Sequence, residues 1–197
     1  MYNLLNLWYN IYLMNIFALS QDPATAAKWH CDKHVVKMIV ESAQMLSTAH
    51  RMLDGAQTKR RSSTGKTMSK YWELDDNRED ALYKAVHTGH PCTVWTMQSH
   101  ENYNWHYSLF NELCKEYTYR YGKIHASQIK LLESLKALPK NIKKSIMKPW
   151  PLAMGSNPEC MDHDDPIASY RKFYQTKQTR FSMVWTKRKT PNWFKSL

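Results

Sequence analysis

Residues 24–53 read ATAAKWHCDKHVVKMIVESAQMLSTAHRML, and this stretch decides the fold class. Its apolar side chains recur every three or four residues, which is the period of a helix that buries one face. The recurring positions are Val36, Ile39, Val40, Ala43, Leu46 and Leu53. Asp22 and Pro23 stand just before it and are the residue types of a helix N-cap and first turn. One continuous helix is therefore expected over residues 24–53.

The opposite face of the expected helix is polar. Its members at helical spacing are His34, Lys37, Glu41, Gln44 and Thr48. Such a stripe is either a face in contact with water or the wall of a cleft, and the spacing alone leaves both interpretations open.

The composition also favours helices. The chain has 197 residues, of which 43% are hydrophobic and 23% charged, enough for one folded core. Five glycines and eight prolines leave few residues for the many turns of a sandwich or barrel. The expected fold is all-α, a single compact helical domain with long irregular loops. Further helices are expected over 75–87, 93–120, 128–138 and 166–181, with an irregular crossing over 140–165.

The expected helix over 93–120 should end at Gly122, a suitable C-terminal cap. Its side chains expected to face the core are Val94, Met97, Leu109, Phe110, Leu113 and Tyr117.

The beginning of the chain is unusual because residues 1–21 carry no charged side chain. They lack the basic region of a signal peptide, and asparagines interrupt any run approaching the roughly 20 apolar residues of a membrane span. Residues 1–13 are interpreted as a non-structural leader before a true start at Met14. Residues 14–197 are interpreted as one helical domain with a basic C-terminal tail. The four cysteines form no CxxC pair, which indicates reduced thiols and a cytoplasmic protein.

The charge points to an anionic partner. Lys and Arg number 28 against 17 Asp and Glu, a net charge of +11, and no acidic residue follows Asp165. Residues 58–67 are expected to form an exposed basic loop. A surplus of this size attracts phosphate backbones, and the many aromatic rings offer faces for unpaired bases. The candidate nucleic-acid contacts are Lys37, Lys59, Arg60, Arg61, Arg120, Lys187, Arg188 and Lys189.

The densest group of reactive side chains is the run from His30 to His34, HCDKH. His30 and His34 stand four residues apart, a spacing that suits two ligands of one zinc ion, with a third from His87, His90 or Cys92. The same residues also fit an ordinary helix surface. A third interpretation is a metal-free site, in which an amine attacks a sugar carbon while a carboxylate assists. Asp32 would be that carboxylate, and Lys33, Lys37 or a free α-amine would be the nucleophile.

Three short motifs resemble a known family. The runs MNIFAL (14–19) and CDKHVV (31–36), followed by the pair His90-Pro91, resemble the pyrimidine dimer DNA glycosylases of the phage endonuclease V type. The resemblance covers about residues 14–123. It implies an all-helical fold, Asp32 as the carboxylate, and as nucleophile an α-amine near Met14, which would belong to Asn15 if the methionine is removed. The chain also resembles an uncharacterised phage protein family that shares the runs CDKHVVKM and EYTYRYGK.

The function expected from these observations is a DNA repair glycosylase with associated AP lyase activity on damaged pyrimidines. It would work through an amine Schiff base, without a cofactor, on duplex DNA with a lesion, in the cytosol of a bacterium or phage-infected host and away from membranes. The candidate catalytic residues are Asp32, Asn15, Lys33, His34 and His90. His90 is either a contact to phosphate or extruded base, or a histidine that caps a turn.

Two alternatives of other classes remain open at this point. One is a metal-dependent helical hydrolase or nucleotide-processing enzyme that uses a histidine cluster. Its ligands would be His30, His34, His87 and His90. The other is a non-catalytic nucleic-acid-binding protein that uses residues 58–67 and the basic tail.

Overall fold

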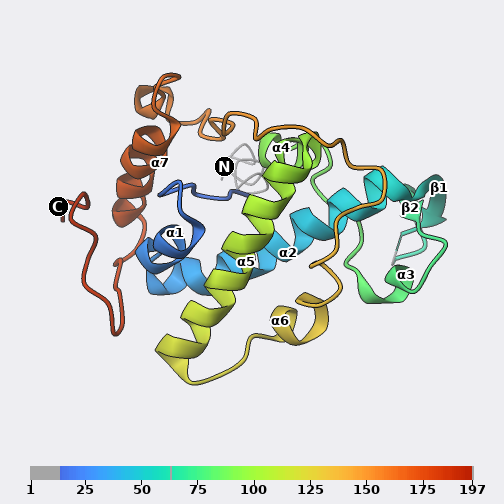
Figure 1. Cartoon of the computed structure of the whole chain (residues 1–197), viewed down its shortest axis with the longest axis horizontal. Helices are drawn as coiled ribbons and strands as arrows, with labels where there is room; N and C mark the ends of the chain where they lie inside the picture. Colours follow the sequence, from blue (N-terminus) through green and yellow to red (C-terminus); the bar gives the residue numbers. More distant parts are fainter. Residues whose placement is uncertain (1–13, 63, 197) are drawn as a thin grey trace, which may run out of the picture.

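The computed structural model describes residues 14–62 and 64–196, so the expectation that 1–13 form a leader lies outside the described residues. These residues form a mostly helical, compact structure with one small sheet (Figure 1). The larger helices are α1 (Pro23–Trp29), α2 (Asp32–Asp54), α4 (Pro91–Gln98), α5 (His100–Tyr121) and α7 (Pro166–Gln175). The short elements are α3 (Arg78–Ala81), α6 (Ala126–Leu131), η2 (Pro158–Cys160) and η3 (Thr176–Thr179).

The expected continuous helix over 24–53 is wrong, because the chain breaks between α1 and α2. Two tertiary hydrogen bonds replace the helical bond that would join the Asp32 N–H to the Lys28 carbonyl. The carbonyl of Lys28 accepts from Nη2 of Arg120 at 3.0 Å, and the Asp32 N–H donates to the Val184 carbonyl at 2.8 Å. The N-terminal signal is confirmed, since the Asp22 carboxylate accepts from the Thr25 N–H at 2.9 Å.

The expected helix over 93–120 is likewise two helices, α4 and α5. Ser99 between them has an extended backbone, and its hydroxyl caps α5 by accepting from the Asn102 N–H at 3.1 Å. Leu109, Phe110 and Leu113 are buried as expected, but Val94 on the short helix is 39% exposed. Gly122 ends α5 with a φ of 65°, the left-handed conformation expected of a glycine cap.

Two other expected helices are much shorter than predicted. Only α3 forms within 75–87, and α6 ends well before Pro139. The irregular crossing over 140–165 is confirmed apart from η2, and Asp165 starts α7 by accepting from the Ala168 N–H at 2.9 Å.

The two strands correct the prediction of a wholly helical fold and of a basic loop over 58–67. β1 (Ala56–Arg61) pairs antiparallel with β2 (Met68–Glu73), in a register that sets Thr58 opposite Tyr71. The hairpin extends α2 at its C-terminal end, on the far side of Figure 1 from α7. Its base is fastened by Arg51 of α2, a 1% exposed side chain that bonds the Trp72 carbonyl and Glu79.

The core forms where α5 crosses α2 and α1, and residues 14–19 run through it without helical structure (Figure 1). Ile16, Ala18 and Leu19 have no exposed surface. Asn15 makes this path possible because its side-chain oxygen accepts from the N–H groups of Ile16 and Phe17, both at 2.8 Å. Among the described residues, none of the helices has the length and apolar character that crossing a bilayer requires.

Candidate functional site

A cavity of about 1040 Å³ lies at the N-terminal end of α2. Four parts of the chain form its walls: residues 14–17, the first turns of α2, the start of α4 with the segment 152–156, and the end of α7 with η3 and Phe181. Four of the five catalytic candidates line it, namely Asn15, Lys33, His34 and His90. The structure therefore brings together residues that are up to 75 positions apart in the chain (90 − 15).

The cavity is basic and partly aromatic. The cations that line it are Lys33, Lys37, Lys177 and Arg180, and no Asp or Glu is among its lining residues in the described part of the chain. Phe17, Phe173 and Phe181 supply apolar walls. Anionic groups and planar rings are therefore the ligand features that this lining favours.

His34 is packed between rings. It is 5% exposed, and its ring stacks on Phe17 with centroids 5.0 Å apart and an interplanar angle of 25°. Burial, together with the nearby His30 and the cations Lys37 and Lys177, lowers the pKa of His34 to about 2, so the ring is neutral at neutral pH. Its Nδ1 has no hydrogen-bond partner among the described residues. His34 therefore brings a buried polar atom without a described partner next to the cavity.

The backbone of Phe17, whose ring stacks on His34, is strained. Its φ is 40°, a left-handed conformation that is rare for a residue with a bulky side chain. Its ring also contacts Tyr174 edge-on, with centroids 5.1 Å apart. Strained backbone of this kind is concentrated at functional sites, where the surrounding packing maintains it.

Asn15 contacts the buried carboxylate of Glu41, which the sequence placed only in the polar stripe of α2. The backbone N–H of Asn15 donates to Oε2 of Glu41 at 2.9 Å, and Oε1 of Glu41 pairs with Nζ of Lys37 at 2.7 Å. Burial raises the pKa of Glu41, although Lys37 opposes the shift. In the 197-residue chain the Asn15 nitrogen belongs to a peptide bond, so it becomes an amine only in a chain that begins there.

The polar stripe of α2 is thus the wall of a cleft for part of its length. His34 and Lys37 line the cavity, whereas Glu41 and Thr48 are buried and bonded to other parts of the chain. His90 has the capping role that the sequence suggested, since its Nδ1 accepts from the Cys92 N–H at 3.2 Å to cap α4, and it also lines the cavity.

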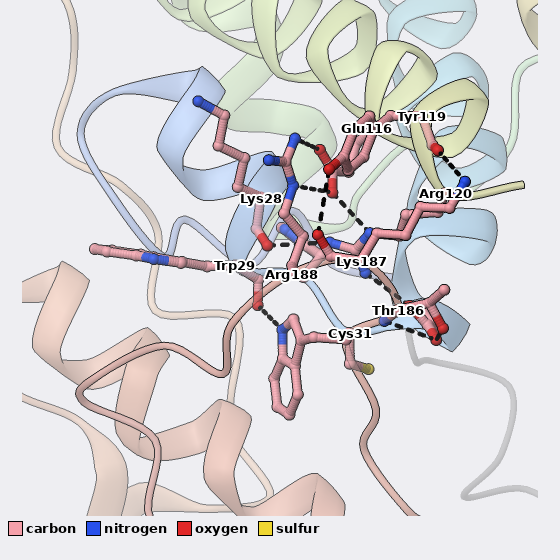
Figure 2. A network of polar contacts seen from close by, with 12 residues as sticks. Lys28, Trp29, Cys31, Glu116, Tyr119, Arg120, Thr186, Lys187 and Arg188 are labelled. Carbon is pink, nitrogen blue, oxygen red and sulfur yellow. Dashed lines mark hydrogen bonds and ion pairs between the residues drawn. The ribbon is translucent and has the colours of Figure 1, made fainter.

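Asp32 is not among the cavity-lining residues, and the structure binds it elsewhere. Oδ1 of Asp32 pairs with Nη1 of Arg120 at 2.9 Å, and Oδ2 accepts from the Thr186 hydroxyl at 2.7 Å. Figure 2 shows Glu116 of α5 between Arg120 and Arg188 in the same network, which ties the C-terminal tail to the helices. Asp32, Arg120 and Arg188 therefore join distant parts of the fold, and none of the three is among the residues that line the cavity.

The remaining candidates for nucleic-acid contact lie on the hairpin and the tail. Lys59 and Arg61 are exposed on β1, whereas Arg60 pairs with Glu73 at 3.0 Å and covers the ring of Tyr71. In the tail, Lys187 donates to the Tyr119 carbonyl at 3.0 Å (Figure 2). Lys189 is exposed.

The alternative of a metal site at His30 and His34 finds no third ligand in the described part of the chain, and the break between α1 and α2 falls between the two histidines. His30 ends α1, and its Nδ1 lies 2.7 Å from the Ala26 carbonyl. Across residues 14–62 and 64–196, no three His, Cys, Asp or Glu side chains come close enough to share one metal ion. The set His30, His34, His87 and His90 therefore lacks the geometry of a metal site.

Sequence reasoning missed Lys177, Arg180 and the ring of Phe17. Lys177 and Arg180 belong to a basic segment after α7 that resembles an ordinary helix end, and nothing in its spacing indicates that it folds back toward α2. Comparisons of the chain with known protein families, with curated proteins and with solved structures found no match.

Proposed function

We propose that this protein is a DNA repair glycosylase with associated AP lyase activity, acting on damaged pyrimidines through an amine and without a metal ion. The observation that carries this proposal is the cavity itself, where lysine amines lie beside aromatic rings and no carboxylate side chain lines the walls in the described part of the chain.

The size and lining of the cavity suit one extruded nucleotide. A volume of about 1040 Å³ lies at the upper end of ordinary ligand pockets, which measure about 300 to 1,000 Å³. Enzymes that act on a base inside a duplex rotate the nucleotide into such a pocket and stack it against apolar side chains. Phe17, Phe173 and Phe181 would contact the base or sugar, and Lys33 and Arg180 the flanking phosphates.

Glu41 is suited to support this chemistry from behind the wall. Burial raises the pKa of this carboxyl, and a shift in that direction is typical of carboxyl groups that act as general acids or bases. Its contacts with Asn15 and Lys37, which both line the cavity, position those two groups. In a chain beginning at Asn15, the same carboxyl would lie next to the α-amine.

A second candidate function is non-catalytic binding of nucleic acid, which the exposed lysine and arginine of β1 favour. Binding through phosphates requires only exposed cations and would not need the buried cavity.

One experiment separates the two functions. Purified protein with excess chelator is incubated with duplexes that carry a pyrimidine dimer, an abasic site or no damage, and strand cleavage is measured with and without borohydride. We expect cleavage of the damaged duplexes alone and a covalent adduct after reduction. Tight, salt-sensitive binding without cleavage of any duplex would support the binding function and reject the enzyme. Cleavage that the chelator abolishes would reject the metal-free mechanism.

A further inference from the structure

Lys177 of η3 is buried in a way that lysines rarely are. Its side chain is 4% exposed and reaches the cavity wall, where Nζ lies 3.5 Å from the centroid of the Phe173 ring. It makes no ion pair and no hydrogen bond with any described residue. Lysine is almost never buried without a partner. Among the described residues the amine is held only by aromatic rings, that of Phe173 and, at 6.0 Å, that of Phe17, and this position calls for a functional explanation.

The groups that face Lys177 are mostly cationic. Arg180 follows Lys177 in the sequence by three residues, and Lys37 belongs to α2. Both cations lower the pKa of Lys177, whereas the thiol of Cys160 in η2 raises it. Burial has the largest effect, and together with the two cations it lowers the pKa of Lys177 to about 8. About a tenth of such amines are neutral at pH 7, and desolvation beside another cation is a known way to activate a lysine nucleophile.

We propose that Nζ of Lys177 is the nucleophile that forms a Schiff base with the sugar C1′ of nucleic acid in this cavity, an inference that rests on the proposed function. The two other lysines in the cavity are worse placed. Lys33 is exposed and lies over the ring of Phe181, and Lys37 is engaged by Glu41. The Asn15 nitrogen is an amide in this chain.

The reaction balances with water and a proton acceptor only. The neutral amine attacks C1′, a C1′–N bond forms, and the bond to the base breaks with its electron pair, the base taking up a proton. The C1′–O4′ bond of the sugar ring then breaks with its electron pair, the remaining N–H proton moves to O4′, and the imine results. Removal of a C2′ proton then expels the phosphate oxygen from C3′, and water hydrolyses the imine to restore the amine. On an abasic site the amine adds to the aldehyde and one water leaves.

The test uses the wild-type chain first, so it does not depend on how a variant folds. Protein is incubated with an abasic duplex and borohydride, which reduces the imine to a stable secondary amine, and the modified peptide is identified by mass spectrometry. We expect the adduct on Lys177. An adduct on the N-terminal amine, Lys33 or Lys37 would overturn the inference and leave the proposed function standing. Cleavage of abasic DNA without any adduct would also overturn the inference, whereas neither cleavage nor adduct would reject both.

A matched pair of variants completes the test. Lys177→Arg keeps the positive charge but cannot form an imine, so trapping should fall roughly 100-fold or more. Binding to a duplex with a tetrahydrofuran abasic analogue, which has no reactive C1′, should stay within about threefold if the charge contact is kept. Lys28→Arg changes an exposed lysine outside the cavity lining and should trap like wild type. Normal trapping by Lys177→Arg would show that this lysine only binds phosphate.

Discussion

The substitution Glu116→Gln should destabilise the protein strongly, because Glu116 joins two arginines in a place with almost no water. Its side chain is 4% exposed, and that of Arg120 is fully buried. Oε1 accepts from Nε of Arg120 at 2.7 Å and from Nε of Arg188 at 2.9 Å, and Oε2 accepts from Nη2 of Arg188 at 2.8 Å. A glutamine has one acceptor oxygen in place of two and turns an N–H group toward a guanidinium.

The magnitude follows from the loss of one partner of a buried ion pair. Such a loss typically costs about 3 to 5 kcal/mol, since the remaining charge stays buried. For a domain of this size each kcal/mol lowers Tm by roughly 2 to 4 °C, so a fall of about 6 to 20 °C is expected. The matched control is Glu112→Gln on the same helix, where the pair with Lys115 is 26% and 61% exposed. Exposed pairs contribute about 0 to 1 kcal/mol, so Tm should fall by less than about 4 °C.

The pH dependence has a definite sign. Burial alone would raise the pKa of Glu116, but hydrogen bonds from Arg188 and Arg120 outweigh it and hold the pKa below the usual 4.5. A carboxyl with a lowered folded-state pKa contributes stability above its unfolded pKa and loses it as pH falls through the folded value. Thermal melts from pH 7 to pH 3 should therefore show the gap between wild type and Glu116→Gln narrowing below about pH 4. Equal melting of the Glu116 and Glu112 variants at pH 7 would refute this account of the network.

Three further predictions concern other parts of the molecule. Charge reversal at Lys59 and Arg61 should leave Tm nearly unchanged while lowering the salt dependence of DNA binding by about one counterion per lost phosphate contact, and an unchanged slope would remove the hairpin from the binding surface. Gly55→Ala should lower stability by about 1 to 3 kcal/mol in urea melts, because its Cβ would lie 2.6 Å from a backbone oxygen, whereas Gly89→Ala meets nothing within 4 Å and serves as the control. Lys177→Met should raise Tm at pH 7 and lose most of that advantage by pH 10, since a lysine with its folded-state pKa lowered to about 8 costs stability below that pH, and the cost disappears only as the pH nears its unfolded-state pKa of about 10.4; a lower Tm at pH 7 would contradict this.

The sequence predicted the helix starts well and their lengths poorly. Asp22-Pro23 and Asp165-Pro166 both cap helices, because a cap is a local arrangement of side chain and backbone. The break at His30 is different in kind. It depends on Arg120, which is 90 residues away (120 − 30), and on the Val184 carbonyl beyond that. No periodicity within 24–53 records these tertiary bonds.

The site was predicted in part for the same reason. His34 and Lys33 on α2 were found because they cluster in sequence, and Asn15 through the resemblance. Lys177 and Phe17 were missed because their roles come from contacts between distant segments. Asp32 was placed in the same cluster because a carboxylate at a helix start suits a catalytic group as well as an ion pair, and its pairing with Arg120 depends on a residue far away in the chain.

Some of the positively charged side chains pair with carboxylates inside the fold, and others lie in the cavity or on the hairpin. The second group determines where an anion can bind. Four arginines are committed to carboxylates within the fold: Arg51, Arg78, Arg120 and Arg188. The cations of the cavity and those of the hairpin lie at opposite ends of α2, whose 23 residues at 1.5 Å each measure about 34 Å. One turn of B-form DNA has nearly the same length, roughly 34 to 36 Å. A duplex that contacts both regions must therefore extend over at least one helical turn, and a shorter one can reach only one of them. If both regions act on the same duplex, the salt dependence of binding must become steeper as the duplex exceeds about ten base pairs, because additional phosphates are then neutralised.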